Sequence, residues 1–302
     1  MTKEKRNGLV VIVVLIFPFL FFLGCLISGL TSPTPPLNQS LPNPNGYDDF
    51  VEAGKMVASD TGNFDEMNEQ QLQSLSDENS NALQMARAGF QKQSRVPIQF
   101  SEVYITSHLN DLANLKRLAQ AFAAAGKLNE MENRPGDAAK SYLDVIHLGN
   151  ESSRGGTLID ELVGIAIESI GRDGLQRISN QLDAKSCRES AVALENLDSQ
   201  RQTLNEVMQQ ENDWSHKTFP GIRYEIVRLM TYKSLLPAQA AARRKFNQKE
   251  VKTRQLIIDL AARAYELDKG SPPANISDLV PTYLKTIPQD PVTGTNMIYS
   301  PR

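Results

Sequence analysis

The chain has 302 residues, with 32 lysines and arginines against 35 aspartates and glutamates and a formal net charge of −3. Hydrophobic residues make up 40% of it, which is enough for a packed core and excludes wholesale disorder. Its two cysteines cannot form a disulfide scaffold. The near-neutral charge excludes a protein that binds nucleic acid through bulk positive charge.

The first element in chain order is an uncharged apolar segment, residues 9–30, preceded by Lys3, Lys5 and Arg6. As a helix it would be about 33 Å long, enough to cross a hydrocarbon core of roughly 30 Å. The positive-inside rule makes residues 1–8 a cytoplasmic stub. We therefore expect a single-pass protein of the inner (cytoplasmic) membrane, with a transmembrane helix at 9–30 and the bulk of the chain extracytoplasmic.

Two other interpretations of this segment stay open. Cys25 follows Gly24 as it would in a lipoprotein signal peptide, and a simple cleaved signal peptide is the remaining alternative. An uncleaved anchor is favoured because the apolar run is long and no small-x-small cleavage site follows it. Each interpretation places the remaining chain outside the cytoplasm.

A proline-rich linker, residues 31–47, comes next and contains five prolines. Such a stretch cannot form a helix and is typical of an extended, semi-rigid spacer. It would hold the following domain away from the bilayer.

Residues 48–269 form the predicted helical domain. Only four prolines interrupt a sequence rich in alanine, leucine, glutamine and glutamate, and apolar residues recur at three- and four-residue spacing. The fold class is therefore mostly α, an extracytoplasmic multi-helix bundle. The expected helices are 48–58, 69–94, 102–132, 136–148, 157–181, 185–217, 222–236 and 239–268.

The hairpin at 118–150 resembles one tetratricopeptide unit, with the characteristic positions on Phe122, Gly126, Ala138 and Tyr142. It differs from that family at Asn129, where an aromatic residue is usual, and no second copy follows. One such unit cannot bury its apolar face alone. The resemblance therefore implies a helical hairpin packed on non-repeat neighbours.

Charge is unevenly distributed along this domain. Residues 48–81 hold nine acids and one base, whereas residues 223–254 hold nine bases and two acids. A possible contact with an anionic surface, such as lipid headgroups, is assigned to Arg243, Arg244, Lys245, Lys249 and Lys252. The alternatives are a solvated face, or packing of this basic helix near the acidic N-terminal one.

Residues 270–302 form a tail with six prolines and many large apolar residues, which predicts a folded, irregular or β segment docked on the last helix through Leu256, Leu260 and Ala264. A short strand is expected at 296–300. The tail resembles the C-terminal segment of type II secretion pseudopilins. The matching residues are Gly270, Pro273, Asp278-Leu279-Val280-Pro281, Tyr283-Leu284, Ile287-Pro288, Asp290-Pro291, Gly294 and Tyr299.

A second resemblance covers most of residues 45–302. The segments that carry it are 45–50, 77–79 with 82–83, 154–160 and the tail. They are similar to a group of uncharacterised membrane-anchored proteins of planctomycete bacteria. This resemblance implies the topology and the helical fold and no particular activity.

No catalytic, metal or cofactor site is predicted. The three histidines, His108, His147 and His216, fall in no metal-binding spacing and are interpreted as surface or boundary residues. Cys187 is interpreted as a lone buried thiol. Two carboxylate pairs, Asp160 with Glu161 and Glu206 with Glu211, are only weak candidates for acid–base work.

The loop at 152–156, Ser-Ser-Arg-Gly-Gly, has two interpretations. It is a candidate binding rim because it is glycine-rich and flexible. The alternative is a plain interhelical loop whose glycines let Thr157 cap the next helix.

The sequence thus favours a non-enzymatic, membrane-anchored interaction or scaffold module of the cell envelope. A pseudopilin-related component of a type II secretion-like system is the alternative. The expected partners are the membrane and an unidentified protein, with no nucleic acid, no small-molecule substrate and no cofactor.

The basic residues before the apolar segment generate a topology prediction. Protease added outside intact spheroplasts should cut the chain beyond residue 47, because Lys3, Lys5 and Arg6 retain the N-terminus inside. Immunoblotting of the digest checks this. Protection of residue 48 onward until the membrane is lysed would contradict the predicted orientation.

Overall fold

The computed structural model describes residues 40–58, 63–101 and 103–299. These residues are mostly helical, as predicted. No helix among them is both long and apolar enough to cross a membrane. The predicted stub, transmembrane segment and first part of the linker lie outside the described residues. The α-helices are α3 (Gly46–Met56), α4 (Glu69–Gly89), α5 (Tyr104–Met131), α6 (Pro135–Ser153), α7 (Leu158–Ile178), α8 (Ala184–Ser199), α9 (Leu204–Thr218) and α10 (Ile222–Lys269).

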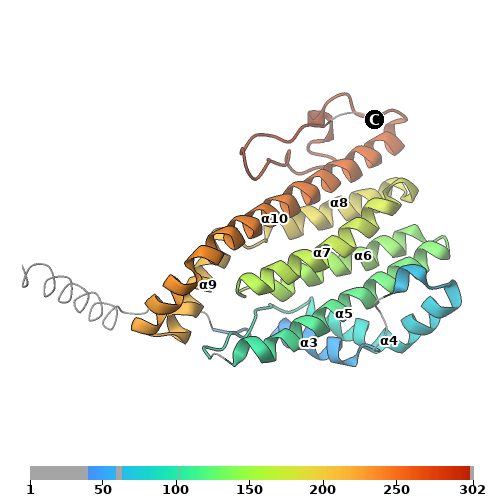
Figure 1. Cartoon of the computed structure of the whole chain (residues 1–302). Coiled ribbons are helices and arrows are strands. Elements are labelled where there is room, and N and C mark those ends of the chain that lie inside the picture. Colours follow the sequence, from blue (N-terminus) through green and yellow to red (C-terminus); the bar gives the residue numbers. More distant parts are fainter. Residues whose placement is uncertain (1–39, 59–62, 102, 300–302) are drawn as a thin grey trace, which may run out of the picture.

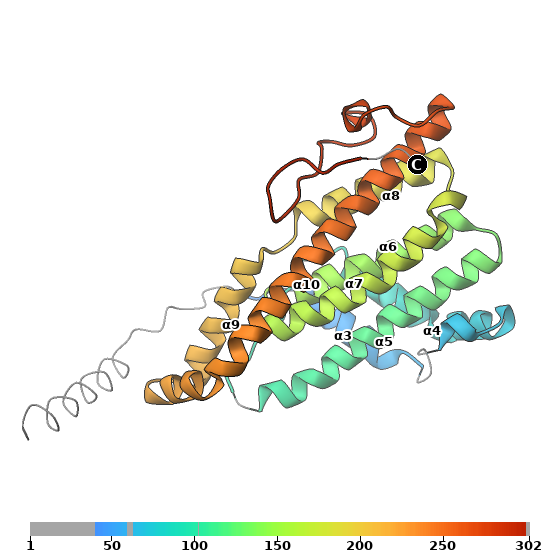
Figure 2. The same ribbon diagram turned by 45° about the horizontal axis from the view of Figure 1, so that its top comes forward.

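The helices pack in an order close to their order in the chain (Figures 1 and 2). Helices α3 and α4 pack on each other and on α5, α5 packs on α6 and α7, and α10 packs across α7 and α8. The acidic α3–α4 region and the basic α10 therefore lie on opposite sides of the bundle (Figure 1). The alternative in which the basic helix packs near the acidic one is wrong for the described residues.

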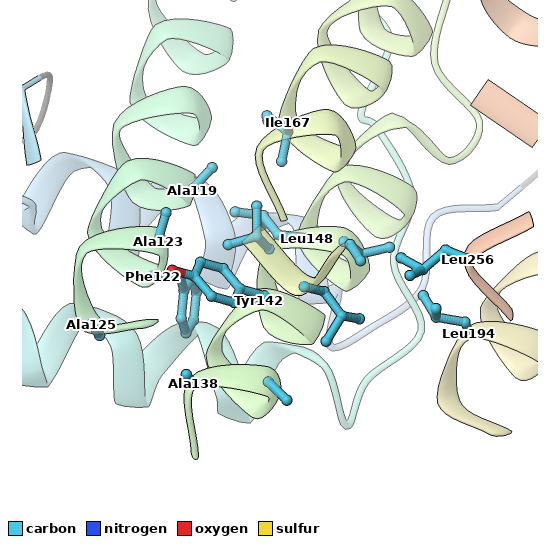
Figure 3. Packing of buried hydrophobic residues seen from close by; sticks show 14 of the residues in the cluster. Ala119, Phe122, Ala123, Ala125, Ala138, Tyr142, Leu148, Ile167, Leu194 and Leu256 are labelled. Carbon is cyan, nitrogen blue, oxygen red and sulfur yellow. The ribbon is translucent and has the colours of Figure 1, made fainter. Parts of the chain in front are cut away.

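The core is a continuous cluster of apolar side chains contributed by α3 to α8 and α10. Figure 3 shows its centre, where Phe122 of α5 faces Tyr142 of α6, and Leu256 of α10 lies beside Leu194 of α8. All four side chains are at most 1% exposed. Burial of each such side chain contributes roughly 1.5–3 kcal/mol relative to exposure.

The predicted hairpin at 118–150 spans the second half of α5 and most of α6. Gly126 lies directly against the ring of Tyr142, where an added Cβ would be 2.8 Å from Cε1. The Tyr142 hydroxyl donates to Glu130, and Arg177 of α7 pairs with the same carboxylate at 2.7 Å. The hairpin packs through the residues that define the tetratricopeptide resemblance, while the resemblance itself stays a prediction.

Helices α6 and α7 approach each other through glycines. A Cβ added at Gly149 would be 2.7 Å from the Gly164 carbonyl oxygen, and one added at Gly164 would be 2.6 Å from the Gly149 oxygen. Real Cβ atoms do not come so close to a carbonyl, so the two backbones touch at this point. Glycine is required here by interhelical distance rather than by backbone conformation.

The single helix expected at 185–217 is wrong, because residues 200–203 separate α8 from α9. Thr203 is the N-cap of α9, and its backbone N and hydroxyl donate to Glu206 Oε2 at 2.7 and 2.8 Å. This capping box is a helix start signal. It is visible in the sequence as Thr-x-x-Glu, inside a segment whose apolar periodicity predicts a continuous helix.

The two helices expected at 222–236 and 239–268 are one helix of 48 residues. Pro237 lies inside α10 on an exposed position. A proline removes one backbone hydrogen bond and often kinks or ends a helix, but here the helix continues through it. Gly270 ends α10 in the left-handed conformation with φ of 78°, which confirms the predicted C-terminal cap.

Helix α4 ends at Gly89 rather than at residue 94, and the following segment folds back on the start of α3. Gly46 N donates to the Gln93 oxygen, and Asn45 bonds both backbone groups of Arg95 at 2.9 Å. Asn45 also caps α3, and Tyr47 is 2% exposed. The folded domain therefore begins before the predicted boundary at residue 48.

The tail packs on α10 and α8. Leu279, Tyr283 and Leu284 are buried in the main core cluster, and the Tyr283 hydroxyl donates to Asp268 at 3.0 Å. Lys285 N donates to Glu195 of α8 at 3.0 Å. Leu256, Leu260 and Ala264, predicted as the docking face, are fully buried, and Leu256 lies against α8.

The strand predicted at 296–300 is wrong for its described residues. The tail has one isolated antiparallel bridge between Gln289 and Asn296, and no strand is present among residues 40–58, 63–101 and 103–299. A strand needs a neighbouring strand to satisfy its backbone groups, and the proline-rich residues before Gln289 do not provide one.

The buried tail generates a stability prediction. Leu279→Ala should lower the free energy of unfolding by about 2–5 kcal/mol, because it removes a fully buried side chain from the core. Ile298→Ala, in the same tail but 82% exposed, is the matched control and should have little effect. Chemical denaturation measures both. Equal stabilities would show that the tail is a separate appendage.

Candidate functional site

The predicted basic surface residues lie on α10, but not all on its surface. Arg243, Arg244, Lys245 and Lys252 are exposed. Lys249 is 2% exposed, and its assignment to an anionic surface contact is wrong. Its helix position faces the bundle, as does that of Phe246, whose ring centroid is 4.5 Å from the Lys249 ammonium.

Lys249 belongs to a buried ion cluster between α10 and α7. Its Nζ lies 2.6 Å from Glu161 Oε1 and 3.7 Å from Glu168 Oε1. Arg201, in the α8–α9 connection, pairs with Glu168 at 2.6 Å. The side chains of Lys249, Glu168 and Arg201 are at most 5% exposed. The cluster therefore joins three separate parts of the chain away from water.

The charges of this cluster stabilise one another. Burial would raise the pKa of Glu168, but Arg201 and Lys249 hold it below its ordinary value. Burial would likewise lower the pKa of Arg201, and Glu168 raises it above its ordinary value. Both groups are therefore charged at neutral pH. Breaking such a pair leaves an uncompensated buried charge, which is strongly destabilising.

A second buried pair joins α5 to the start of α7. His108 Nε2 lies 2.5 Å from Asp160 Oδ1, and the backbone N and hydroxyl of Thr157 donate to Asp160 Oδ2 at 2.7 and 2.9 Å. His108 is 4% exposed, so its interpretation as a surface or boundary histidine is wrong. Tyr104 stacks on the imidazole at a centroid distance of 4.7 Å.

Neither predicted carboxylate pair forms a site. Asp160 bonds His108, whereas Glu161 bonds Lys249 and Ser153, so the two neighbours point to different partners. Glu206 caps α9, and Glu211 accepts from Leu158 N at 2.9 Å. Adjacent residues on a helix differ by about 100°, which explains why sequence neighbours separate here.

An apolar pocket of about 300 Å³ lies beside the His108–Asp160 pair, between α5, α7 and α9. Its wall includes Leu109, Ile159 and Trp214, and Glu211 is the acidic residue in its lining. Burial raises the pKa of Glu211, the Leu158 hydrogen bond opposes this, and Asp160 adds to it. The pocket lining contains no serine or cysteine, and the Thr157 hydroxyl is already bonded to Asp160. The His108–Asp160 contact links α5 to the first turn of α7.

The remaining predicted groups behave as structural elements. Cys187 is fully buried, and burial raises the pKa of its thiol to about 11, so the prediction of a lone buried thiol is confirmed. Thr157 caps α7, as one interpretation of the 152–156 loop predicted. In the part of the chain that the structure describes, no three histidine, cysteine or acidic side chains are placed to hold a metal ion.

The sequence signals for these buried groups are incomplete. Thr157 and Asp160 form a Thr-x-x-Asp helix start that is visible in the sequence. The link from Asp160 to His108, 52 residues away, depends on tertiary packing. The same holds for the Lys249–Glu161 pair, which is 88 residues apart.

Comparison with known proteins adds no further identification. No protein-family model matches the chain, and no curated protein or solved structure matches it either.

The buried ion cluster generates a stability prediction. Lys249→Met should lower the free energy of unfolding by about 3–5 kcal/mol, because Glu161 and Glu168 would lose their shared cation. Lys252→Met, three residues along the same helix and exposed, is the matched control and should change stability by less than about 0.5 kcal/mol. Thermal and denaturant unfolding measure the difference. Equal effects would show that the cluster contributes no specific stabilisation.

Proposed function

We propose that this protein is a membrane-anchored, non-enzymatic interaction module of the cell envelope that lies against an anionic lipid surface. The arm, defined as α9 and the N-terminal half of α10, would make the contact. The observation that carries this proposal is an exposed stripe along one side of α10.

The stripe consists of residues spaced so that they share one face of the helix. Its described, exposed members are Ile226, Leu229, Pro237, Ala240 and Arg244. Leu229 is 81% exposed and Ile226 50%, values that are high for large aliphatic side chains on the same helix face. Arg243 and Lys245 flank Arg244 on either side and are also exposed.

This combination fits the boundary between lipid headgroups and acyl chains. Apolar side chains on one part of the stripe would enter that boundary, and the guanidinium and ammonium groups would meet lipid phosphates. Each basic residue near an anionic bilayer contributes about 1 kcal/mol. Three such residues provide reversible attachment rather than insertion.

The predicted anchor places the domain within reach of that surface. Residues 31–39, between the predicted transmembrane segment and the first described residue, span at most about 30 Å when extended. A helical domain on so short a tether meets the bilayer frequently. The basic residues of the arm would then determine which side of the domain faces the bilayer.

The tetratricopeptide-like hairpin and the unidentified protein partner remain part of the proposal as expectations from the sequence. The pseudopilin-related alternative also stays a prediction. It requires processing after Gly8, whereas an anchored module keeps its first residues. N-terminal sequencing or intact-mass measurement of the isolated protein separates the two.

Vesicle co-sedimentation tests the lipid contact. A fragment of residues 40–302, first verified as helical by circular dichroism, should bind vesicles containing phosphatidylglycerol and not vesicles of phosphatidylcholine alone. Replacing Arg243, Arg244 and Lys245 by glutamine should weaken binding by about 100-fold. High salt should weaken it too.

The matched control replaces three exposed lysines away from the arm, Lys116, Lys185 and Lys269, by glutamine. It removes the same charge and should retain most of the binding. Equal losses in the two triple variants would indicate a net-charge effect only and contradict the proposed surface. Absence of binding by the unaltered fragment would contradict the lipid contact itself.

A further inference from the structure

A cleft of about 450 Å³ opens between the segment that follows α4 and the C-terminal end of α6. It is separate from the arm and from the apolar pocket. Ser40, Pro42, most of residues 90–95 and the C-terminal end of α6 with Arg154 line it. Its size lies in the range of small-molecule sites. We call it the Arg95 cleft.

Three basic side chains line the Arg95 cleft, and two of them have carboxylate partners. Lys92 pairs with Asp49 at 2.5 Å, and Arg154 pairs with Glu151 at 2.5 Å. Arg95 has no carboxylate partner among the described residues. A guanidinium remains charged at any physiological pH, so Arg95 places in the cleft one positive charge that no carboxylate of the described residues pairs with.

Hydrogen bonds from neighbouring segments hold the backbone at Arg95 in place. Asn45 Nδ2 donates to its backbone oxygen, and its backbone N donates to Asn45 Oδ1, both at 2.9 Å. The next residue, Val96, donates from its backbone N to the Arg154 oxygen at 2.9 Å. The backbone of Arg95 is thereby held between the start of α3 and the end of α6.

Gly155 determines where the Arg95 side chain lies. A Cβ added at Gly155 would be 2.7 Å from Arg95 Cγ and 2.8 Å from Nε, so the side chain rests directly on the glycine backbone. Gly155 also has φ of 71°, a conformation that favours glycine. In the structure residues 152 and 153 of the predicted loop belong to α6. Arg154, the next residue, lines this cleft, and Gly155 supports the Arg95 side chain.

The cleft also has an apolar wall. The rings of Phe90 and His147 stack with centroids 4.3 Å apart and an interplanar angle of 14°, and both residues line the cleft. Burial lowers the pKa of His147, Glu151 opposes this and Arg154 adds to it, and the net lowering favours a neutral ring in the cleft wall. A ligand that fits must combine an anionic group with a body that packs on these rings.

We propose that the Arg95 cleft binds a small organic oxyanion, a molecule with a carboxylate or phosphate group. The planar fork of Arg95 would pair with two of its oxygens, the geometry in which arginine recognises such groups. The body of the molecule would pack on Phe90 and His147. Binding would place an anion beside a guanidinium that has no carboxylate partner in the described part of the chain.

Isothermal titration calorimetry on the full-length protein in detergent tests this proposal. The probes are phenyl phosphate and benzoate, with benzyl alcohol as the neutral analogue of similar shape. The anions should bind and benzyl alcohol should not. Arg95→Gln should weaken binding of both anions by about ten-fold or more.

Two further variants test whether binding depends on the Arg95 guanidinium itself. Arg87→Gln removes a guanidinium that pairs with Asp144 on the surface of the same region and should leave binding unchanged. Arg95→Lys retains the charge without the fork and should bind with intermediate affinity. Unchanged melting temperatures of the variants verify their folding.

Three results would overturn the proposal: no binding of either anion at millimolar concentration, equal binding of benzyl alcohol, or equal losses in Arg95→Gln and Arg87→Gln. Stronger binding of phenyl phosphate than of benzoate would support a phosphate ligand, and the reverse a carboxylate ligand. None of these outcomes depends on the arm, so failure here leaves the proposed lipid contact to its own test.

Discussion

The buried contact between Lys249 and Glu161 is the interaction on which much of the architecture depends. It fixes the longitudinal and rotational position of α10 on α7, because the ammonium must reach both Glu161 and Glu168. An ion pair shielded from water gives little net stability compared with apolar packing, but it strongly disfavours other registers that would leave its charges unpaired. Arg201 extends the same constraint to the α8–α9 connection.

The position of α10 in turn decides which surfaces are available. With Lys249 and Phe246 facing the bundle, the opposite side of α10 carries the exposed stripe that ends at Arg244. The same helix supports α8 and the tail on its C-terminal half. One helix therefore links the compact core to the proposed lipid contact, whereas the Arg95 cleft is formed by different elements, at the end of α6 and after α4.

The helix boundaries that were predicted wrongly lie where two local sequence signals disagree. The Thr203–Glu206 capping box marked a helix start inside the segment expected at 185–217, and local periodicity alone did not reveal it. Pro237 suggested a helix end because proline usually interrupts a helix. In the structure its side chain lies on an exposed face, and the flanking turns belong to one helix. The strand expected in the tail has no neighbouring strand to pair with among the described residues, only an isolated bridge between Gln289 and Asn296.

The sequence by itself determined the mostly helical class, the helices α3 and α5 to within two residues, the Gly270 cap and the burial of Leu279, Tyr283 and Leu284 in the tail. These features follow from local periodicity, capping chemistry and hydrophobicity, which act over a few residues. Only the tertiary structure decided that Lys249 and His108 are buried, and that the Arg95 side chain lies on Gly155 with no carboxylate partner among the described residues. Each of these depends on contacts between residues about 50 to 90 positions apart. The local sequence around a charged residue on a helix does not show whether its side chain contacts water or an opposite charge on a distant helix.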